Sequence, residues 1–209
     1  MAKRKPAGKR PLAGKGKPAG GDRIGLRRVD AKSGELLHPR GVRDRADDIA
    51  EVRQMLAAGE IDVAINELRW LLDGCHPFIE AHQLLGEIAL GDGDLELAQN
   101  HFGYAWQLGL NALPKSGDRP SLPYQRPANR AFLEAGKGLA WCLLQADKPD
   151  QARQVIEQML ALDGHDPLGV RNLAAAHGQP PNATGQSSPG ATEEKRTKGA
   201  TDETRIEHG

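Results

Sequence analysis

Apolar residues in the middle of the chain recur at the three-to-four-residue spacing of amphipathic helices, and no run alternates apolar and polar residues as a half-buried strand does. Gly, Asp and Pro separate the periodic segments. Pro77 and Pro167 suit first helical positions, and Asp94 and Asp150 suit first turns. We expect an all-α fold, with helices over these ranges: 43–58, 60–73, 78–91, 94–110, 130–146, 149–163 and 167–176.

Both ends of the chain lack this periodicity. The first 22 or so residues combine Lys and Arg with Gly, Pro and Ala, and the end of the chain is rich in Gly, Ser, Thr and Pro. Such compositions bury too little apolar surface to offset the entropy lost on ordering. The sequence therefore predicts a disordered basic arm (1–28), a linker (29–42), a helical repeat domain (43–177) with a Pro-rich insertion (111–129), and a disordered tail (178–209).

Matching residues recur 34 positions apart in two of the expected helix pairs: Gly59 and Gly93, Ala64 and Ala98, Leu68 and Phe102, and Leu71 and Ala105. This spacing is the period of the tetratricopeptide repeat. The second copy, AHQLLGEIALGDGDLELAQNHFGYA, closely resembles the pattern of that family. Its small residues Gly86 and Ala98 stand where the two helices of a hairpin cross, and a bulky side chain there would push the axes beyond about 8–10 Å.

A third, less similar copy aligns Ala152 with Ala98, which lies 54 residues earlier. The excess of about 20 residues over one period is supplied by the Pro-rich insertion. The resemblance covers about two thirds of the chain. It implies a short right-handed superhelical array of about three antiparallel helix hairpins, a tetratricopeptide-like solenoid, with a last helix that caps the stack. An ordinary helical bundle is the alternative.

Charge is distributed unevenly, although the formal net charge is zero. The arm is strongly basic, and its first cations are Lys3, Arg4, Lys5, Lys9 and Arg10. Interleaved Lys and Arg suit sequence-independent phosphate contacts, but no aromatic residue is present to stack on bases. We therefore expect at most weak, nonspecific and salt-dependent nucleic-acid binding. The alternatives are a solubilising tail or, in a eukaryote, a nuclear import signal.

The sequence favours a cytoplasmic location. The basic start is not followed by the apolar stretch of an export signal, and no apolar run approaches the roughly 20 residues of a membrane span. Cys75 and Cys142 are far apart and belong to no ligand motif, so we expect two free thiols, with Cys142 in the core. No metal, phosphate-loop or acid–base constellation is recognisable, and we expect neither a cofactor nor enzyme activity. We expect His82 to pack in or near the core.

The family resemblance implies that function resides in a concave groove lined by the first helix of each repeat. The corresponding positions are Ile49 and Arg53, Gln83 and Glu87, and Lys137 and Trp141. This set resembles the carboxylate clamp of chaperone-binding members only at Arg53 and Lys137, which argues against that role. Trp141 either anchors a partner or packs on the insertion.

The long insertion is a further candidate, because loops of that length are often functional. Its Tyr124 and Arg126 either close over the groove or belong to a surface excursion. Together these features predict a scaffold that holds a peptide or helix of a protein partner in its concave face. The alternative is a nucleic-acid or ribosome-associated factor that uses the basic arm. The sequence identifies neither the partner nor the oligomeric state.

Overall fold

The computed structural model describes residues 23–115 and 117–173. Most of the predicted basic arm and the whole predicted tail (178–209) lie outside these ranges. The described part is mostly helical, as the periodicity predicts. A short helix α1 (Arg40–Arg43) precedes six longer ones. These are α2 (Ala46–Ala57), α3 (Ile61–Gly74), α4 (Ile79–Gly91), α5 (Leu95–Ala112), α6 (Pro127–Gln145) and α7 (Pro149–Leu162).

The predicted helix over 167–176 is not formed in its described part. Only a 3-10 turn, η1 (Val170–Asn172), is present. Asp166 and Gly169 have φ angles of 52° and 67°, in the left-handed region, and such residues interrupt a right-handed helix. Asp166 accepts hydrogen bonds from the backbone N–H groups of Val170 and Arg171, so its side chain stabilises the turn in place of a helix.

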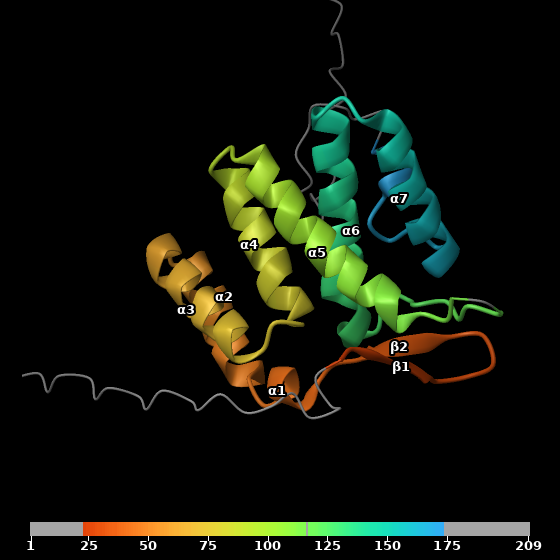
Figure 1. Ribbon diagram of the computed structural model, residues 1–209, viewed down its shortest axis with the longest axis horizontal. Coiled ribbons are helices and arrows are strands. Elements are labelled where there is room, and N and C mark those ends of the chain that lie inside the picture. The colour runs from red at the N-terminus through yellow and green to blue at the C-terminus, as the bar shows by residue number, and fades with distance from the viewer. Residues whose placement is uncertain (1–22, 116, 174–209) are drawn as a thin grey trace, which may run out of the picture.

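Each helix from α2 to α7 packs against the next one along the chain, and α4 also packs against α6. Figure 1 shows the resulting row of helix pairs, α2 with α3, α4 with α5, and α6 with α7. The turns within the first two pairs contain Gly59 and Gly93, whose φ angles of 77° and 79° explain why glycine recurs there.

The close helix crossing predicted at Gly86 and Ala98 is confirmed. Ala98 is fully buried, and a Cβ on Gly86 of α4 would lie only 2.7 Å from ring atoms of Phe102 on α5. Phe102 in turn covers Gly138 of α6, where a Cβ would meet the same ring at 2.7 Å. One aromatic ring therefore fills the space that two glycines leave between three helices.

The apolar interior forms two clusters. The larger is built mainly from α5, α6 and α7, and the smaller from α1, α2, α3 and α4. Helix α4 belongs to both, because Ala89 packs in the larger cluster and Leu85 in the smaller one. Cys142 is fully buried in the larger cluster, as predicted, and burial raises the pKa of its thiol to about 12. Cys75 is buried in the smaller cluster.

A β-hairpin that the sequence analysis missed precedes the helices. Strand β1 (Gly25–Arg28) pairs antiparallel with β2 (Gly34–Leu37), so it occupies the end of the predicted arm and part of the predicted linker. Four-residue strands are too short to show a recognisable alternation. Asp30 stabilises the turn by accepting hydrogen bonds from the backbone N–H groups of Lys32 and Ser33 and from the Ser33 hydroxyl. The Ser33 hydroxyl is the main cause that lowers the pKa of Asp30 to about 2.

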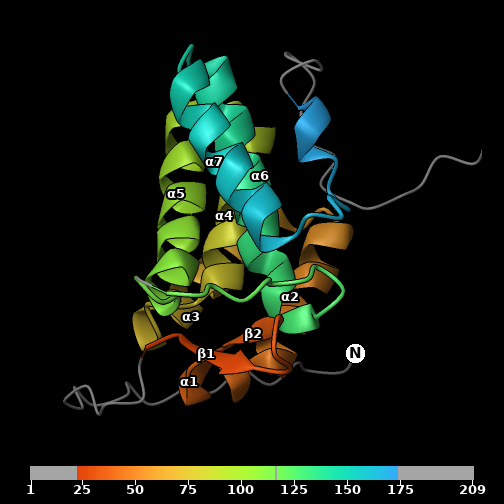
Figure 2. The same ribbon diagram turned by 90° about the vertical axis from the view of Figure 1, so that its right-hand side faces the viewer.

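The hairpin fastens the Pro-rich insertion to the helices, and Figure 2 shows the insertion running between the hairpin and the helix ends. Ser121 accepts a hydrogen bond of 2.8 Å from the N–H of Gly34, and its own N–H donates over 2.8 Å to the carbonyl of Lys32. Farther along, the N–H of Leu122 donates to the carbonyl of Leu162 at the end of α7. The insertion is therefore hydrogen-bonded to the hairpin on one side and to the end of α7 on the other.

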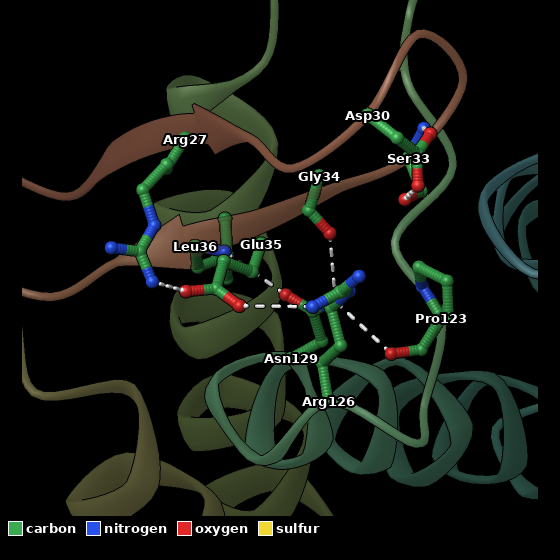
Figure 3. A network of polar contacts seen from close by, with 9 residues as sticks. All are labelled: Arg27, Asp30, Ser33, Gly34, Glu35, Leu36, Pro123, Arg126 and Asn129. Atoms are coloured by element: carbon green, nitrogen blue, oxygen red, sulfur yellow. Dashed lines mark hydrogen bonds and ion pairs between the residues drawn. The ribbon is translucent and has the colours of Figure 1, made fainter.

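Asn129, on the first turns of α6, completes this attachment (Figure 3). Its side chain is fully buried and accepts a hydrogen bond of 3.0 Å from the N–H of Leu36. Its amide nitrogen donates to the carbonyls of Gly34 and Pro123, at 3.3 and 3.1 Å. One amide group thus joins the hairpin, the insertion and α6.

In the described part of the chain, no helix has the length and apolarity that a membrane span needs.

Candidate functional site

Helix α2 contributes Arg53 to the predicted groove. Arg53 is half exposed and forms an ion pair of 2.8 Å with Glu80 on α4. The other predicted groove position on α2, Ile49, is buried in the smaller apolar cluster and is only 7% exposed. The structure therefore corrects the assignment of Ile49 to the groove, because packing under α2 takes this side chain away from the surface.

Helix α4 contributes Gln83 and Glu87, which lie one turn apart on one face. Gln83 is buried, with 2% of its surface exposed, and its side chain hydrogen-bonds to Glu87. Burial, and after it the negative charge of Glu134, raise the pKa of the Glu87 carboxyl from 4.5 to about 7, although Arg53 and the hydrogen bond from Gln83 oppose the shift. Glu87 therefore exchanges a proton near neutral pH.

Helix α6 contributes Lys137 and Trp141, with Glu134 one turn before Lys137. Both Glu134 and Lys137 are partly buried. Burial lowers the pKa of the Lys137 ammonium group, and the charges of Asp166 and Glu134 partly restore it. Trp141 is partly buried against the larger apolar cluster. Its ring is therefore shared between the core and the surface.

The insertion brings Tyr124 to the same place. Its N–H donates to the Asp163 carboxylate over 2.8 Å, and its hydroxyl donates to Glu134 over 2.7 Å. Burial, followed by these contacts with Glu134, raises the pKa of Tyr124 to about 12. Arg126 points elsewhere, since it pairs with Glu35 of β2 at 3.5 Å (Figure 3). The structure thus places Tyr124, but not Arg126, beside the predicted groove residues.

We call this region the α2–α4–α6 face and define it by eight residues, of which Gln83 is buried and Trp141 packs against the larger apolar cluster: Arg53, Glu80, Gln83, Glu87, Tyr124, Glu134, Lys137 and Trp141. The connections are the ion pair from α2 to α4, the charge interactions across α4 and α6, and the bond from the insertion to α6. The sequence analysis missed Glu80 and Glu134. Helical spacing could have found both, because each lies one turn before a predicted residue.

The face brings together several kinds of polar and aromatic group. It combines carboxyl groups, cations, a phenol and an indole edge, which are hydrogen-bond and hot-spot groups of protein interfaces. Among the described residues, no three His, Cys, Asp or Glu side chains are grouped as ligands of a metal ion.

A second surface lies across α3, α4 and α5. It contains an open cleft of about 320 Å³ with an apolar floor that includes Leu85 and Ile88. At its edge His101 lies beside His82, with 3.2 Å between their Nδ1 atoms, and the Tyr104 ring packs on His82 at 4.6 Å between centroids. Burial is the main cause that lowers the pKa of His82 to about 4, and burial also lowers that of His101. His82 is thus half-buried, as predicted.

The basic-arm candidates Lys3, Arg4, Lys5, Lys9 and Arg10 lie outside the described residues.

Comparison with known proteins assigns no family to the chain, because no family model matches it and no curated protein or solved structure is significantly similar to it.

Proposed function

We propose that this chain is a tetratricopeptide-like scaffold that binds an extended peptide or a helix of a protein partner on its α2–α4–α6 face. The observation that carries the proposal is the assembly of that face. Arg53 and Glu87, chosen by family spacing from α2 and α4, interact through their charges. Glu87 and Lys137 of α6 each interact through charge with Glu134, which links the third helix to the other two. A helical bundle without a binding face gives no reason for polar groups from alternate helices to gather in this way.

The polar character of the face also supports the proposal. A buried carboxyl such as that of Glu87 is costly to keep, since it costs free energy whenever it ionises. Proteins concentrate such groups at functional sites more often than elsewhere. The nucleic-acid alternative rests on the basic arm and gains no support from the described residues.

The test is a selection of random-sequence peptides displayed on phage against the immobilised full chain, followed by titration of the selected peptides into the isotope-labelled protein. We expect the largest amide shift changes on α2, α4 and α6. Lys137→Glu should change the affinity at least tenfold, because it reverses a charge that interacts with Glu134 on the face. Lys148→Glu is the matched control, since Lys148 is exposed at the turn between α6 and α7.

Two results would contradict the proposal. One is the absence of any peptide that binds the folded chain. The other is a set of shift changes confined to the cleft across α3, α4 and α5. Circular dichroism of each variant excludes unfolding as the cause of a lost interaction.

A further inference from the structure

The α2–α4–α6 face contains more carboxyl groups than its own cations neutralise. Glu87 and Glu134 lie on neighbouring helices, and among the described residues neither forms an ion pair with Lys, Arg or His. Arg53 is committed to Glu80 at 2.8 Å. The hydrogen-bond partners of the two carboxyls are instead neutral, because Gln83 bonds to Glu87 and Tyr124 bonds to Glu134. Arg53 acts on Glu87, and Lys137 on Glu134, through charge but without an ion pair.

A second observation, independent of charge, indicates a missing donor at the same place. The side-chain oxygen of Gln83 is buried and has no hydrogen-bond partner, although only 2% of the residue is exposed. An unsatisfied buried acceptor is uncommon in a folded protein, because it costs about 1–3 kcal/mol. Since the Gln83 side chain also bonds to Glu87, this oxygen belongs to the same electronegative site.

The nearby charges do not fill this site. Lys137 lies one turn after Glu134, but it forms no ion pair with a described residue, and its charge interacts with Asp166 as well as with Glu134. Arg130 lies over the ring of Tyr124, with 5.7 Å from its guanidinium carbon to the ring centroid, and is exposed. The two carboxyls therefore remain available to a cation from outside.

We propose that the α2–α4–α6 face holds a Lys or Arg side chain of the docked segment between the carboxyl groups of Glu87 and Glu134. This inference rests on the function proposed above and specifies the chemistry of its partner. A guanidinium or ammonium group supplies several N–H donors, and charge-assisted bonds to carboxylates are stronger than bonds between neutral groups. An acidic segment would face two unpaired carboxyls, and an apolar one would bury them without compensation.

Binding of such a cation is coupled to a proton. The cation favours the ionised form of Glu87, whose pKa is about 7 in the free protein. Below that pH the complex must release a proton from Glu87, so affinity falls as the pH falls, by up to about tenfold per pH unit. Above it the carboxylate is already formed, and affinity levels off. The other charged or titratable groups that face this region are Glu80, Arg53, Lys137, Tyr124 and Asp166.

The experiment uses a fluorescein-labelled peptide from the phage selection, measured by fluorescence polarisation with the full chain. Each Arg of the peptide is replaced in turn by citrulline, and each Lys by norleucine, so that charge is removed at nearly constant shape. We expect one position to lose about 10- to 100-fold in affinity with the wild-type chain. The same replacement should cost less than about threefold with the Glu87→Gln/Glu134→Gln variant, because the two changes remove the same interaction.

The controls separate this inference from the proposed function. Glu157→Gln removes an exposed carboxyl on α7 and should leave every affinity unchanged. If peptides bind the face but contain no Lys or Arg, or if neutral replacements cost as much with the Gln variant as with the wild type, the cation site is refuted while the docking function stands. If no peptide binds the face, the docking function itself fails. An affinity that is constant from pH 6 to 8 also contradicts the inference.

Discussion

The hydroxyl of Tyr124 donates a hydrogen bond of 2.7 Å to the carboxylate of Glu134, and this contact joins the insertion to helix α6 at the candidate binding face. The two residues come from different elements, and the backbone N–H of Tyr124 is held separately by Asp163. The phenol therefore occupies a defined position beside the carboxylate, which makes the insertion part of the face and not a detached excursion.

Removal of this hydroxyl should weaken the fold modestly. We expect Tyr124→Phe to lower the free energy of unfolding by about 1 kcal/mol, because the ring still packs while a hydrogen bond to a carboxylate is lost. Urea denaturation measures the change. Tyr104→Phe is the matched control, since the Tyr104 side chain is exposed and should change stability by less than about 0.5 kcal/mol. Equal effects of the two variants would contradict the assigned role of the Tyr124 hydroxyl.

Glu87 should make the protein less stable as the pH rises. Its pKa is about 7 in the folded chain, above the ordinary value of 4.5, so between these values the native state holds a proton that the unfolded state has released. Stability should therefore fall from about pH 4.5 to pH 7 and then level off. We expect Glu87→Gln to raise the free energy of unfolding by about 1–3 kcal/mol relative to the wild type at pH 8, with little difference at pH 4.5. Urea denaturation at both pH values, with Glu157→Gln as control, decides the matter.

His82 should act in the opposite direction at lower pH. Its pKa of about 4 lies below the ordinary value of 6.5, so between these values the unfolded state binds a proton that the native state does not. Stability conferred by neutral His82 is complete above pH 6.5 and is lost progressively toward pH 4. We expect the melting temperature of His82→Phe, which keeps a ring against Tyr104, to fall less between pH 6.5 and pH 4 than that of the wild type. His165→Gln, at an exposed position, is the control and should not alter how much the melting temperature falls between pH 6.5 and pH 4.

Gly86 should tolerate no side chain. A Cβ there would lie 2.7 Å from the Phe102 ring, so we expect Gly86→Ala to destabilise the fold by about 1–3 kcal/mol, although alanine favours helices. Gly103 provides a matched test within α5, because a Cβ at that position meets only a Leu139 methyl group, at 3.8 Å. Gly103→Ala should instead stabilise by about 0.5–1 kcal/mol. Thermal denaturation measures both effects. Equal changes of melting temperature in the two variants would contradict the close packing of Phe102 on Gly86.

Asn129 should hold the hairpin against the helices. Asn129→Ala leaves the buried N–H of Leu36 and the carbonyls of Gly34 and Pro123 without their partner, so we expect a loss of about 2–4 kcal/mol. Hydrogen exchange at the Leu36 amide should accelerate more than exchange within α3, because the hairpin detaches first. Asn111→Ala, at an exposed position of α5, should change stability by less than about 0.5 kcal/mol. Uniform acceleration across the chain would argue against a local attachment.

The helical part of the fold could be predicted because its signals are local. Apolar spacing and the glycines at positions 59 and 93 indicate where helices form and turn, and these features need only neighbouring residues. The family resemblance, and not this spacing, named Gln83, Glu87 and Lys137 as groove positions, while spacing of one turn places Gln83 and Glu87 on one side of α4. The burial of Ile49 was not predictable from spacing alone, because it depends on which side of α2 the smaller cluster covers.

Periodicity in the sequence thus determined helices α2 to α7 and their order, and the small residues Gly86 and Ala98 indicated the close crossing of α4 and α5. Tertiary structure alone decided the hairpin, the attachment of the insertion and the pairing of carboxyls on the face. Asn129 meets Leu36 across 93 positions, and Glu134 receives Tyr124 from a segment without regular structure. Such contacts leave no periodic trace, because they depend on where the chain places distant residues. The pKa values of Glu87 and His82 follow from burial, which arises only when the helices have packed.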